Sequence, residues 1–450
     1  MRVNSGWIVF AAVFAIHTTS PVSIQGDSRW TIPQALSLIH QRNFALDEYA
    51  ARFPAQDYYF VECVSAQHVR TYPVKQATCP DGHFYYRYPV SMAIVAAPFV
   101  VVMQAALYVL HPALSRFPDR GVVGAFFNGD LVTGAPVAEI VIASFFVAAA
   151  AAILFLVLRE ILALRQALAA TFVFAFCTPA WSTASRALFQ HAPSMFVNCL
   201  LLLVVFRAVR RPALLWMVGP LAALNFFIRP TNAVPALVLG IFVLWRAPRQ
   251  AIWGALAGAP VIAIFVALSY RMYGFALAPY FYVKQSNASA FALQPRVFEA
   301  LAGNLVSPAR GLLVFCPFLV LLFLPVAWRA KLPIAVHTVR PWLIAIVALQ
   351  WLLVSTYRDW VGGFCYGPRY MCDVIPYLMV LMAPVFYAVF EPRAGIRLDR
   401  VIFGVLIAAA LFIHARGAYS IAVHDWNSKP VNINEAQWRV WDWRDPPFLR

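Results

Sequence analysis

The sequence predicts an all-α polytopic membrane protein. Hydrophobic residues make up 62% of the 450 residues and charged residues only 12%, whereas soluble domains are about half apolar and about a quarter charged. The apolar residues are also gathered into stretches that reach the roughly 20 residues a helix needs to cross a bilayer. A soluble globular protein is therefore excluded, and the first partner that the composition demands is a lipid bilayer.

About eleven stretches have the length and apolarity of transmembrane helices. They are 6–22, 133–158, 167–180, 190–206, 213–228, 230–245, 252–270, 311–327, 341–356, 370–390 and 401–420. The first is expected to be an uncleaved signal anchor, because His17–Pro21 does not form the small-residue cleavage site of a signal peptide. The sequence contains no internal repeat or linker, so residues 1–420 are predicted to form one transmembrane domain, followed by a tail at 421–450.

The charge pattern predicts the orientation. The net charge is +16 at pH 7, but there is no basic run and no nucleic-acid-binding motif, so nucleic acid is not an expected partner. Lys and Arg gather instead in alternate loops, as expected of loops that face the cytoplasm. These are the loops that follow 133–158, 190–206, 230–245, 311–327 and 370–390. The N-terminus is then cytoplasmic and the C-terminus lies outside.

The apolar stretch 89–110 needs separate treatment, because a single crossing there would turn every later basic loop outward. Pro89, Pro98 and Pro112 favour a broken element. We therefore expect 89–110 to lie in the interface, to enter and return, or to pair with Gly121–Phe127. The alternative is one ordinary span in a protein with a weak charge bias.

Six segments are left on the outer side: 23–88, 181–189, the turn near Arg229, 271–310, 357–369 and 421–450. The first outer loop is long, and Thr31–His40 is predicted to be a short amphipathic helix within it, lying along the membrane. Cys63 and Cys79 in this loop form a disulfide if it faces an oxidising compartment, and otherwise stay free thiols. The tail is rich in Trp and is expected to fold back onto the outer surface, with its rings in the headgroup layer.

Asp27 is the main candidate catalytic residue. It stands just past the first apolar stretch, near the start of the long outer loop, and a carboxylate at a membrane surface is costly to keep there. Such a group can take a proton from an attacking hydroxyl, or bind a divalent cation through oxygen. Its structural alternative is a helix N-cap. Asp27 is also the one candidate metal ligand, and no cofactor beyond an optional divalent cation is predicted.

Several arginines on the same side predict an anion site. Arg87 stands just before 89–110, where its guanidinium could hold a phosphate in bidentate fashion or simply extend to the lipid headgroups. Arg186, Arg229 and Arg369 lie in other outer segments. Together these four are the candidate phosphate-binding residues.

Three further residues complete the candidate site. His191, Tyr88 and Tyr366 are candidate contacts to a sugar or an acceptor. Asp373 is expected to pair with Arg369 or Arg358 and to be structural.

The sequence contains no P-loop, dinucleotide-binding fingerprint, HExxH motif or nucleophile elbow, so an activated donor would have to come from within the membrane. A transporter or flippase is one alternative, although it would favour charges deep in the spans and two related halves. A noncatalytic subunit of a glycan assembly system is another.

Five short motifs resemble the membrane glycosyltransferases of the C superfamily, which include protein mannosyltransferases and lipid A aminoarabinose transferase. They are Gly26–Arg29, Arg87–Pro89, Ser185–His191, Arg229–Asn232 and Tyr366–Tyr370. The last three also resemble a bacterial group within that superfamily. The resemblance extends over nearly the whole chain, although each motif is short.

The resemblance implies a hexosyl- or pentosyltransferase of the bacterial inner membrane, acting on its periplasmic face. The donor would be a polyprenyl-phosphate sugar and the acceptor a hydroxyl of a glycan, lipid or protein. Asp27 stands at the place of the family's loop-one acid, which acts as the base in an inverting transfer, and Arg87 at the place of a basic residue that contacts the lipid phosphate. Many relatives carry two adjacent acids there, whereas Ser28 follows Asp27 here, so an obligatory metal is not implied.

Overall fold

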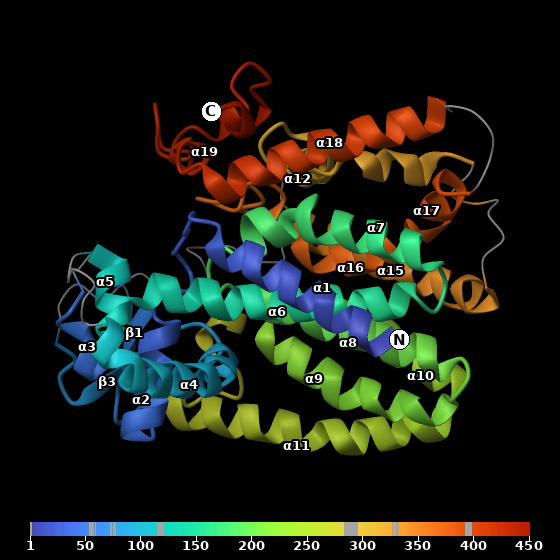
Figure 1. Cartoon of the computed structure of the whole chain (residues 1–450). Coiled ribbons are helices and arrows are strands. Elements are labelled where there is room, and N and C mark those ends of the chain that lie inside the picture. Colours follow the sequence, from blue (N-terminus) through green and yellow to red (C-terminus); the bar gives the residue numbers. More distant parts are fainter. Residues whose placement is uncertain are drawn as a thin grey trace.

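The computed structural model describes residues 2–53, 58, 60–72, 74, 78–114, 121–282, 296–325, 328, 333–391 and 398–450. These residues form a bundle of long apolar helices, with a small three-stranded sheet and several short helices at one end (Figure 1). The predicted class, a helical integral membrane protein, agrees with this architecture.

Eleven α-helices are described up to residue 273. They are α1 (Arg2–Thr19), α2 (Thr31–Gln41), α3 (Asp47–Ala50), α4 (Ser91–Leu114), α5 (Gly121–Phe127), α6 (Ala135–Leu158), α7 (Leu164–Phe176), α8 (His191–Ala208), α9 (Val218–Ile228), α10 (Ala233–Arg246) and α11 (Pro248–Tyr273). The later helices are α12 (Val297–Val306), α13 (Leu312–Phe315), α15 (Ile334–Ser355), α16 (Ile375–Leu381), α17 (Ala383–Val389), α18 (Leu398–Tyr419) and α19 (Ala422–Asp425). The chain also contains one short π-helix, η2 (Ala180–Ala184). The short 3₁₀-helices described are η3 (Pro212–Met217), η4 (Pro230–Asn232), η5 (Pro279–Tyr282), η6 (Pro317–Phe323), η7 (Arg369–Val374), η8 (Gln437–Trp441) and η9 (Pro447–Leu449).

Fewer helices can cross a membrane than the eleven predicted. In the described part of the chain, six are long and apolar enough: α4, α6, α8, α11, α15 and α18. A seventh span is possible if η7–α16 and α17, which meet at a bend of 47°, count as one. Four of the remaining predicted spans correspond to shorter apolar helices, namely Ser5–Thr19, Leu164–Phe176, Pro212–Ile228 and Pro230–Arg246.

The overcount has a structural reason, since hydropathy measures composition and not helix continuity. The predicted span 311–327 is divided at Cys316 into α13 and η6, with Pro317 opening the second piece. Pro212 and Pro230 likewise open short helical segments, because proline fits the first turn of a helix but not its interior hydrogen-bond ladder.

The segment 89–110 differs from its prediction in one respect. It forms α4, a single unbroken helix of 24 residues that contains Pro98 and Pro112, so the predicted break is wrong. Its length and apolarity suffice for a crossing. Helix α4 lies at the end of the bundle that holds α2, α5 and the sheet (Figure 1). The expectation that this segment does not cross the membrane alone stays a prediction.

The first outer loop contains a sheet that the sequence analysis missed. Strand β1 (Val61–Ser65) pairs antiparallel with both β2 (Arg70–Thr71) and β3 (Gly82–Tyr86). Cys63 and Cys79 form a disulfide in this loop, so of the two alternatives the structure has the bridge. The predicted amphipathic helix is present as α2, and it packs against α4.

Helix α6 lies at the centre of the bundle, where α1 and α8 pack along it. It is rich in alanine, and small side chains let neighbouring helices approach closely. The tail folds back onto the protein as predicted, but Trp426 is fully buried with Trp360 and Val361 rather than exposed to headgroups. Trp438 and Trp443 are exposed.

Candidate functional site

A large pocket opens at the end of the bundle that carries the sheet and the tail. Its volume is about 1020 Å³, within or slightly above the range of small-molecule sites. Each of the six segments predicted to share one side of the membrane contributes to its lining, for example through Asp27, Phe189, Arg229, Tyr280, Asp359 and Asn434. The segments that the charge pattern grouped together therefore meet around one cavity.

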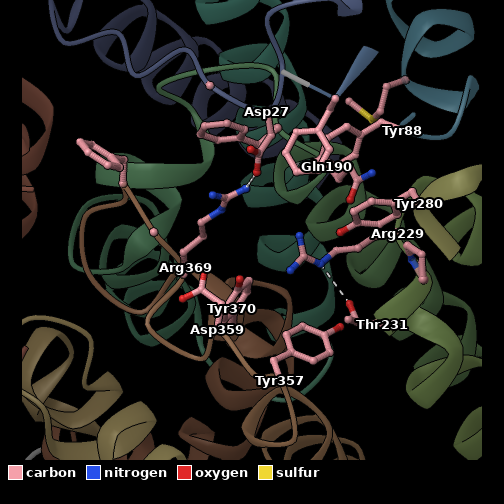
Figure 2. Close-up of a pocket in the computed structure, with 18 of the residues that line it drawn as sticks. Asp27, Tyr88, Gln190, Arg229, Thr231, Tyr280, Tyr357, Asp359, Arg369 and Tyr370 are labelled. Atoms are coloured by element: carbon pink, nitrogen blue, oxygen red, sulfur yellow. Dashed lines mark hydrogen bonds and ion pairs between the residues drawn. The ribbon is translucent and has the colours of Figure 1, made fainter. Parts of the chain in front are cut away.

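Asp27 and Arg369 form an ion pair across this pocket (Figure 2). Their side chains keep 21% and 14% of their exposure, so a ligand in the cavity can reach both. Asp27 lies in a turn closed by a hydrogen bond from the Arg29 N–H to the Gly26 carbonyl. It does not cap α2, which begins after Trp30 without a side-chain cap, so the structural alternative for Asp27 is ruled out.

Arg369 is held in place by the turn before it and by an aromatic ring. Gly367 has a φ of +70°, and a Cβ there would come within 2.7 Å of the Phe315 ring, so this turn requires glycine. Arg369 then opens η7, and its guanidinium lies 4.8 Å from the centre of the Phe189 ring. A cation over an aromatic face is stabilised by the quadrupole of the ring.

Arg229 enters the pocket from the junction of α9 and η4 (Figure 2). Its Nε is 2.8 Å from Asp373 Oδ2 and 3.0 Å from Thr231 Oγ1, and its Nη1 is 3.3 Å from His191 Nε2. Asp373 thus pairs with Arg229 and not with Arg369 or Arg358 as expected. His191 is fully buried behind Arg229, 3.5 Å from Asp373, and does not line the pocket.

Aromatic side chains form much of the remaining wall. The rings of Tyr88 and Tyr280 lie 4.5 Å apart, and those of Tyr357 and Tyr370 5.4 Å apart. Burial raises the pKa of Tyr88 and of Tyr280 above the ordinary phenol value, so both hydroxyls stay protonated and can donate hydrogen bonds. Such a wall suits a ligand with both apolar and hydroxyl surfaces.

Arg87 does not reach the pocket. Its Nε lies 3.0 Å from Oε1 of Glu62, which is 1% exposed, and its guanidinium lies 4.1 Å from the centre of the Tyr72 ring. Arg70 also binds Glu62 through two contacts of 2.7 Å. A buried carboxylate requires cationic partners, and Arg87 is one of them, so we assign it no phosphate-binding role.

Replacing Arg87 by Ala should weaken the first outer loop without affecting donor binding. Arg70 would still hold Glu62, but this buried carboxylate would lose one of its two cationic partners, so we expect a loss of about 1–3 kcal/mol in the free energy of unfolding. Thermal unfolding in detergent and the KM for a sugar donor would be measured together. A rise of tenfold or more in KM, with unchanged unfolding, would return Arg87 to the donor site.

Arg186 and Tyr366 are also placed elsewhere, each fully buried. Arg186 donates to the backbone carbonyls of His17 and, at 2.7 Å, of Ser20, where it satisfies the carbonyl end of α1. The Tyr366 hydroxyl donates to the Ile413 carbonyl at 2.7 Å. Both residues stabilise the bundle and neither lines the pocket.

Replacing Arg186 by Ala should therefore destabilise the protein strongly. The carbonyls at the end of α1 would lose their donor in a buried place, which costs about 1–3 kcal/mol for each unsatisfied group. We expect a lower unfolding midpoint with an unchanged KM for the donor in the fraction that folds. Arg186→Lys should recover only part of this loss, because an ammonium cannot reproduce the guanidinium fork.

Several lining residues were missed by sequence reasoning. Gln190 is 6% exposed, and its Nε2 has no hydrogen-bond partner among the described residues. Asp359 brings a second carboxylate, and burial raises its pKa. Asp359 lies in the predicted outer segment 357–369, and this position could have marked it as a candidate site residue. Nothing in the sequence pattern marks Tyr280.

The predicted optional divalent cation finds little support in the ligands at Asp27. Calcium and magnesium prefer several oxygen ligands, but the Asp27 carboxylate is already bound by the Arg369 guanidinium. Among the residues that the structure describes, no three His, Cys, Asp or Glu side chains gather as they would to hold a metal ion. The side chains around Asp27 thus do not fit such an ion.

The arrangement can carry out a particular chemistry, since two carboxylates, Asp27 and Asp359, and three arginines, Arg229, Arg358 and Arg369, line one partly apolar cavity. A carboxylate can accept a proton, and the guanidinium groups can stabilise negative charge that develops nearby. Comparison with known proteins adds no assignment, because the sequence matches no family model and no curated protein.

Proposed function

We propose that this protein is a membrane glycosyltransferase that moves a sugar from a polyprenyl-phosphate donor to a hydroxyl acceptor. The observation that carries the proposal is the convergence of Asp27, Arg369 and Arg229 on one pocket at an end of an apolar helix bundle. In this proposal the lipid-linked donor enters the pocket from the bilayer. The resemblance of five motifs to the C superfamily points to the same chemistry.

The proposed reaction is a single displacement. Asp27 takes the proton of the acceptor hydroxyl as its oxygen bonds to the anomeric carbon. The bond between that carbon and the phosphate oxygen breaks, and its electron pair leaves with the lipid phosphate. Arg369 and Arg229 stabilise the charge that grows on the leaving phosphate. A single displacement inverts the configuration at the sugar.

The resting pair of Asp27 and Arg369 fits this scheme. A guanidinium binds a phosphate at least as well as a carboxylate, often in bidentate fashion. Arrival of the donor phosphate would give Arg369 a second anionic partner and leave Asp27 a freer base. Tyr88, Tyr280 and Gln190 offer hydrogen bonds to sugar hydroxyls, with ring faces for the apolar side of the sugar.

We propose that the pocket lies on the periplasmic side of a bacterial inner membrane, with the N-terminus in the cytoplasm and the tail outside, an orientation in which the shorter apolar helix Ser5–Thr19 crosses as well. The positive-inside pattern supports this orientation. The Cys63–Cys79 disulfide lies in the same loop as Asp27, and disulfides persist in oxidising compartments. The tail contributes Asn434 and Gln437 to the pocket lining, so the tail and the pocket share one side.

A transport function is the competing assignment, because Arg229, Asp373 and His191 form a buried charged cluster, and such clusters mark transport pathways in membrane proteins. The purified protein in lipid vesicles would be given labelled polyprenyl-phosphate sugars together with candidate hydroxyl acceptors. Sugar transfer with release of the lipid phosphate supports the enzyme. Movement of the intact donor between leaflets, with no bond cleavage, refutes the glycosyltransferase proposal and supports a transporter.

A further inference from the structure

Glu139 is a fully buried carboxylate near the start of α6, in the second turn of the helix. It accepts hydrogen bonds from Gln25 Nε2 at 2.7 Å, from Ser28 Oγ at 2.5 Å and from the Leu188 backbone N–H at 3.0 Å. These donors come from two segments that are more than 150 residues apart in the chain. One side chain therefore joins both segments to the central helix.

The three hydrogen-bond donors lie next to groups that carry the proposed catalytic pair, Asp27 and Arg369. Gln25 and Ser28 flank Gly26 and Asp27, so the Glu139 carboxylate holds the Asp27 turn from both ends. Leu188 directly precedes Phe189, the ring against which the Arg369 guanidinium lies. The carboxylate of Asp27 and the aromatic support of Arg369 are thus fixed to the same point on α6.

The tip of the Asp27 turn, at Gly26, has no packing, although Ser28 at the end of the turn is buried. Gly26 is exposed, and a Cβ added there would meet nothing within 4 Å. The turn is restrained by the hydrogen bonds from Gln25 and Ser28 to Glu139, together with the Asp27–Arg369 ion pair and the Ile24–Arg186 backbone hydrogen bond. Misplacing a catalytic group by about 1 Å can reduce a rate about 100-fold, so the restraint bears on activity.

We propose that Glu139 is a positioning residue, which holds Asp27 and the Phe189 support of Arg369 in register for glycosyl transfer. The proposal rests on the function proposed above for Asp27. All three groups that contact Glu139 are hydrogen-bond donors, and an ionised carboxylate is an acceptor only. Glu139 is not among the residues that line the pocket, so it acts through the Asp27 turn and not on the substrate.

The kinetic test compares Glu139→Ala with Glu139→Gln. Gln keeps one oxygen for Ser28 and Leu188, and the amide of Gln25 can turn to accept a hydrogen bond from the new amide. We expect Ala to lower kcat by about 100-fold, with KM for the donor changed by less than about threefold, and Gln to retain kcat to within about tenfold. Loss in Gln as severe as in Ala, or no loss in Ala, would overturn the proposal.

Ser144→Ala is the matched control. Ser144 is also buried in α6, and its hydroxyl has no hydrogen-bond partner among the described residues. Removing that hydroxyl should leave kcat within about twofold of the parent, because no hydrogen bond is lost. A loss in Ser144→Ala equal to that of Glu139→Ala would mean that α6 tolerates no change, and would remove the specific role of Glu139.

A labelling test is independent of activity. Five cysteines are free and buried, and the other two form the disulfide, so a cysteine introduced by Gly26→Cys can be labelled selectively with a nitroxide spin label. Position 26 is exposed, so it labels readily in every variant, and the readout is the mobility of the attached nitroxide. Adding Glu139→Ala should raise that mobility, with a rotational correlation time shorter by about twofold or more, whereas Glu139→Gln should leave it near the parent value. An unchanged mobility in Glu139→Ala would refute the positioning role.

Ser428 is an exposed residue of the tail, and the mobility of a nitroxide attached to Ser428→Cys reports on general loosening, so it should not respond to Glu139→Ala. If the mobility there rises as much as at position 26, the effect is not local and the proposal fails. Loss of restraint at position 26 in a protein that transfers no sugar from any donor would contradict the proposed function, and would still establish Glu139 as the residue that holds the turn.

Discussion

Replacing Asp27 by Asn is expected to lower kcat for glycosyl transfer by about 100- to 10,000-fold, the usual contribution of a general base. The amide has the size of the carboxylate and keeps an oxygen that can accept a hydrogen bond from Arg369, so the fold should survive. It cannot take the proton of the acceptor hydroxyl. The measurement is single-turnover transfer from a labelled polyprenyl-phosphate sugar in lipid vesicles, with the unfolding midpoint recorded in parallel.

Asp359→Asn is the matched control, because Asp359 is a second carboxylate in the pocket lining. Its variant should lose less activity than Asp27→Asn. If Asp359→Asn gives the larger loss while Asp27→Asn stays within about threefold of the parent, the base is Asp359 and the mechanism proposed for Asp27 is wrong.

Exchanging the two partners separates catalysis from structure. The double variant Asp27→Arg with Arg369→Asp should restore the ion pair, and with it most of the stability lost in either single variant. It should stay inactive, because the carboxylate would then project from η7 and not from the turn held by Glu139. Recovery of activity in the exchanged protein would mean that only the ion pair matters.

The second large effect concerns Arg229 and Asp373, which are 4% and 1% exposed. Replacing Arg229 by Met leaves the Asp373 carboxylate buried without its closest cation, and breaking a buried ion pair in this way costs about 3–5 kcal/mol. We expect a comparable fall in the free energy of unfolding in detergent. A fall of less than about 1 kcal/mol in the free energy of unfolding is typical of an exposed ion pair and would contradict the burial of Arg229 and Asp373.

Removing both charges tests the phosphate role of Arg229. The double variant Arg229→Met with Asp373→Asn has no uncompensated charge and should recover most of the lost stability. It still lacks the guanidinium that faces the leaving phosphate, so kcat/KM for the donor should stay about 100-fold or more below the parent. A stable double variant with normal kcat/KM would remove Arg229 from the phosphate site.

Much of the fold could be predicted from the sequence because the ability of a helix to cross a bilayer depends on the length and apolarity of one continuous stretch. Five of the six long apolar helices, α6, α8, α11, α15 and α18, lie where hydropathy predicted a span. The errors come from features that composition does not record. The division at Cys316 depends on a proline within an apolar run, and α4 stays unbroken through Pro98, because the same residue can end one helix and be accommodated in another.

The candidate site was predictable only in part. Asp27, Arg229, Arg369 and Tyr88 line the pocket, since each stands at the end of an apolar stretch on the predicted outer side. Arg87 stands in a similar position and was not distinguishable from them. Its partner Glu62 becomes a buried carboxylate only when β1 pairs with β3, and the sequence analysis had not predicted these strands.

By itself the sequence determined the membrane class, most of the long helices and the set of segments that share one side, because each follows from the composition of a short stretch and its flanking charges. Only the tertiary structure decided which cations face the pocket. Asp27 and Arg369 are 342 residues apart, and Arg186 turned out to hold the carbonyls at the end of α1. A buried charge must find a partner, but local pattern does not say which one, and the choice is made when distant segments pack.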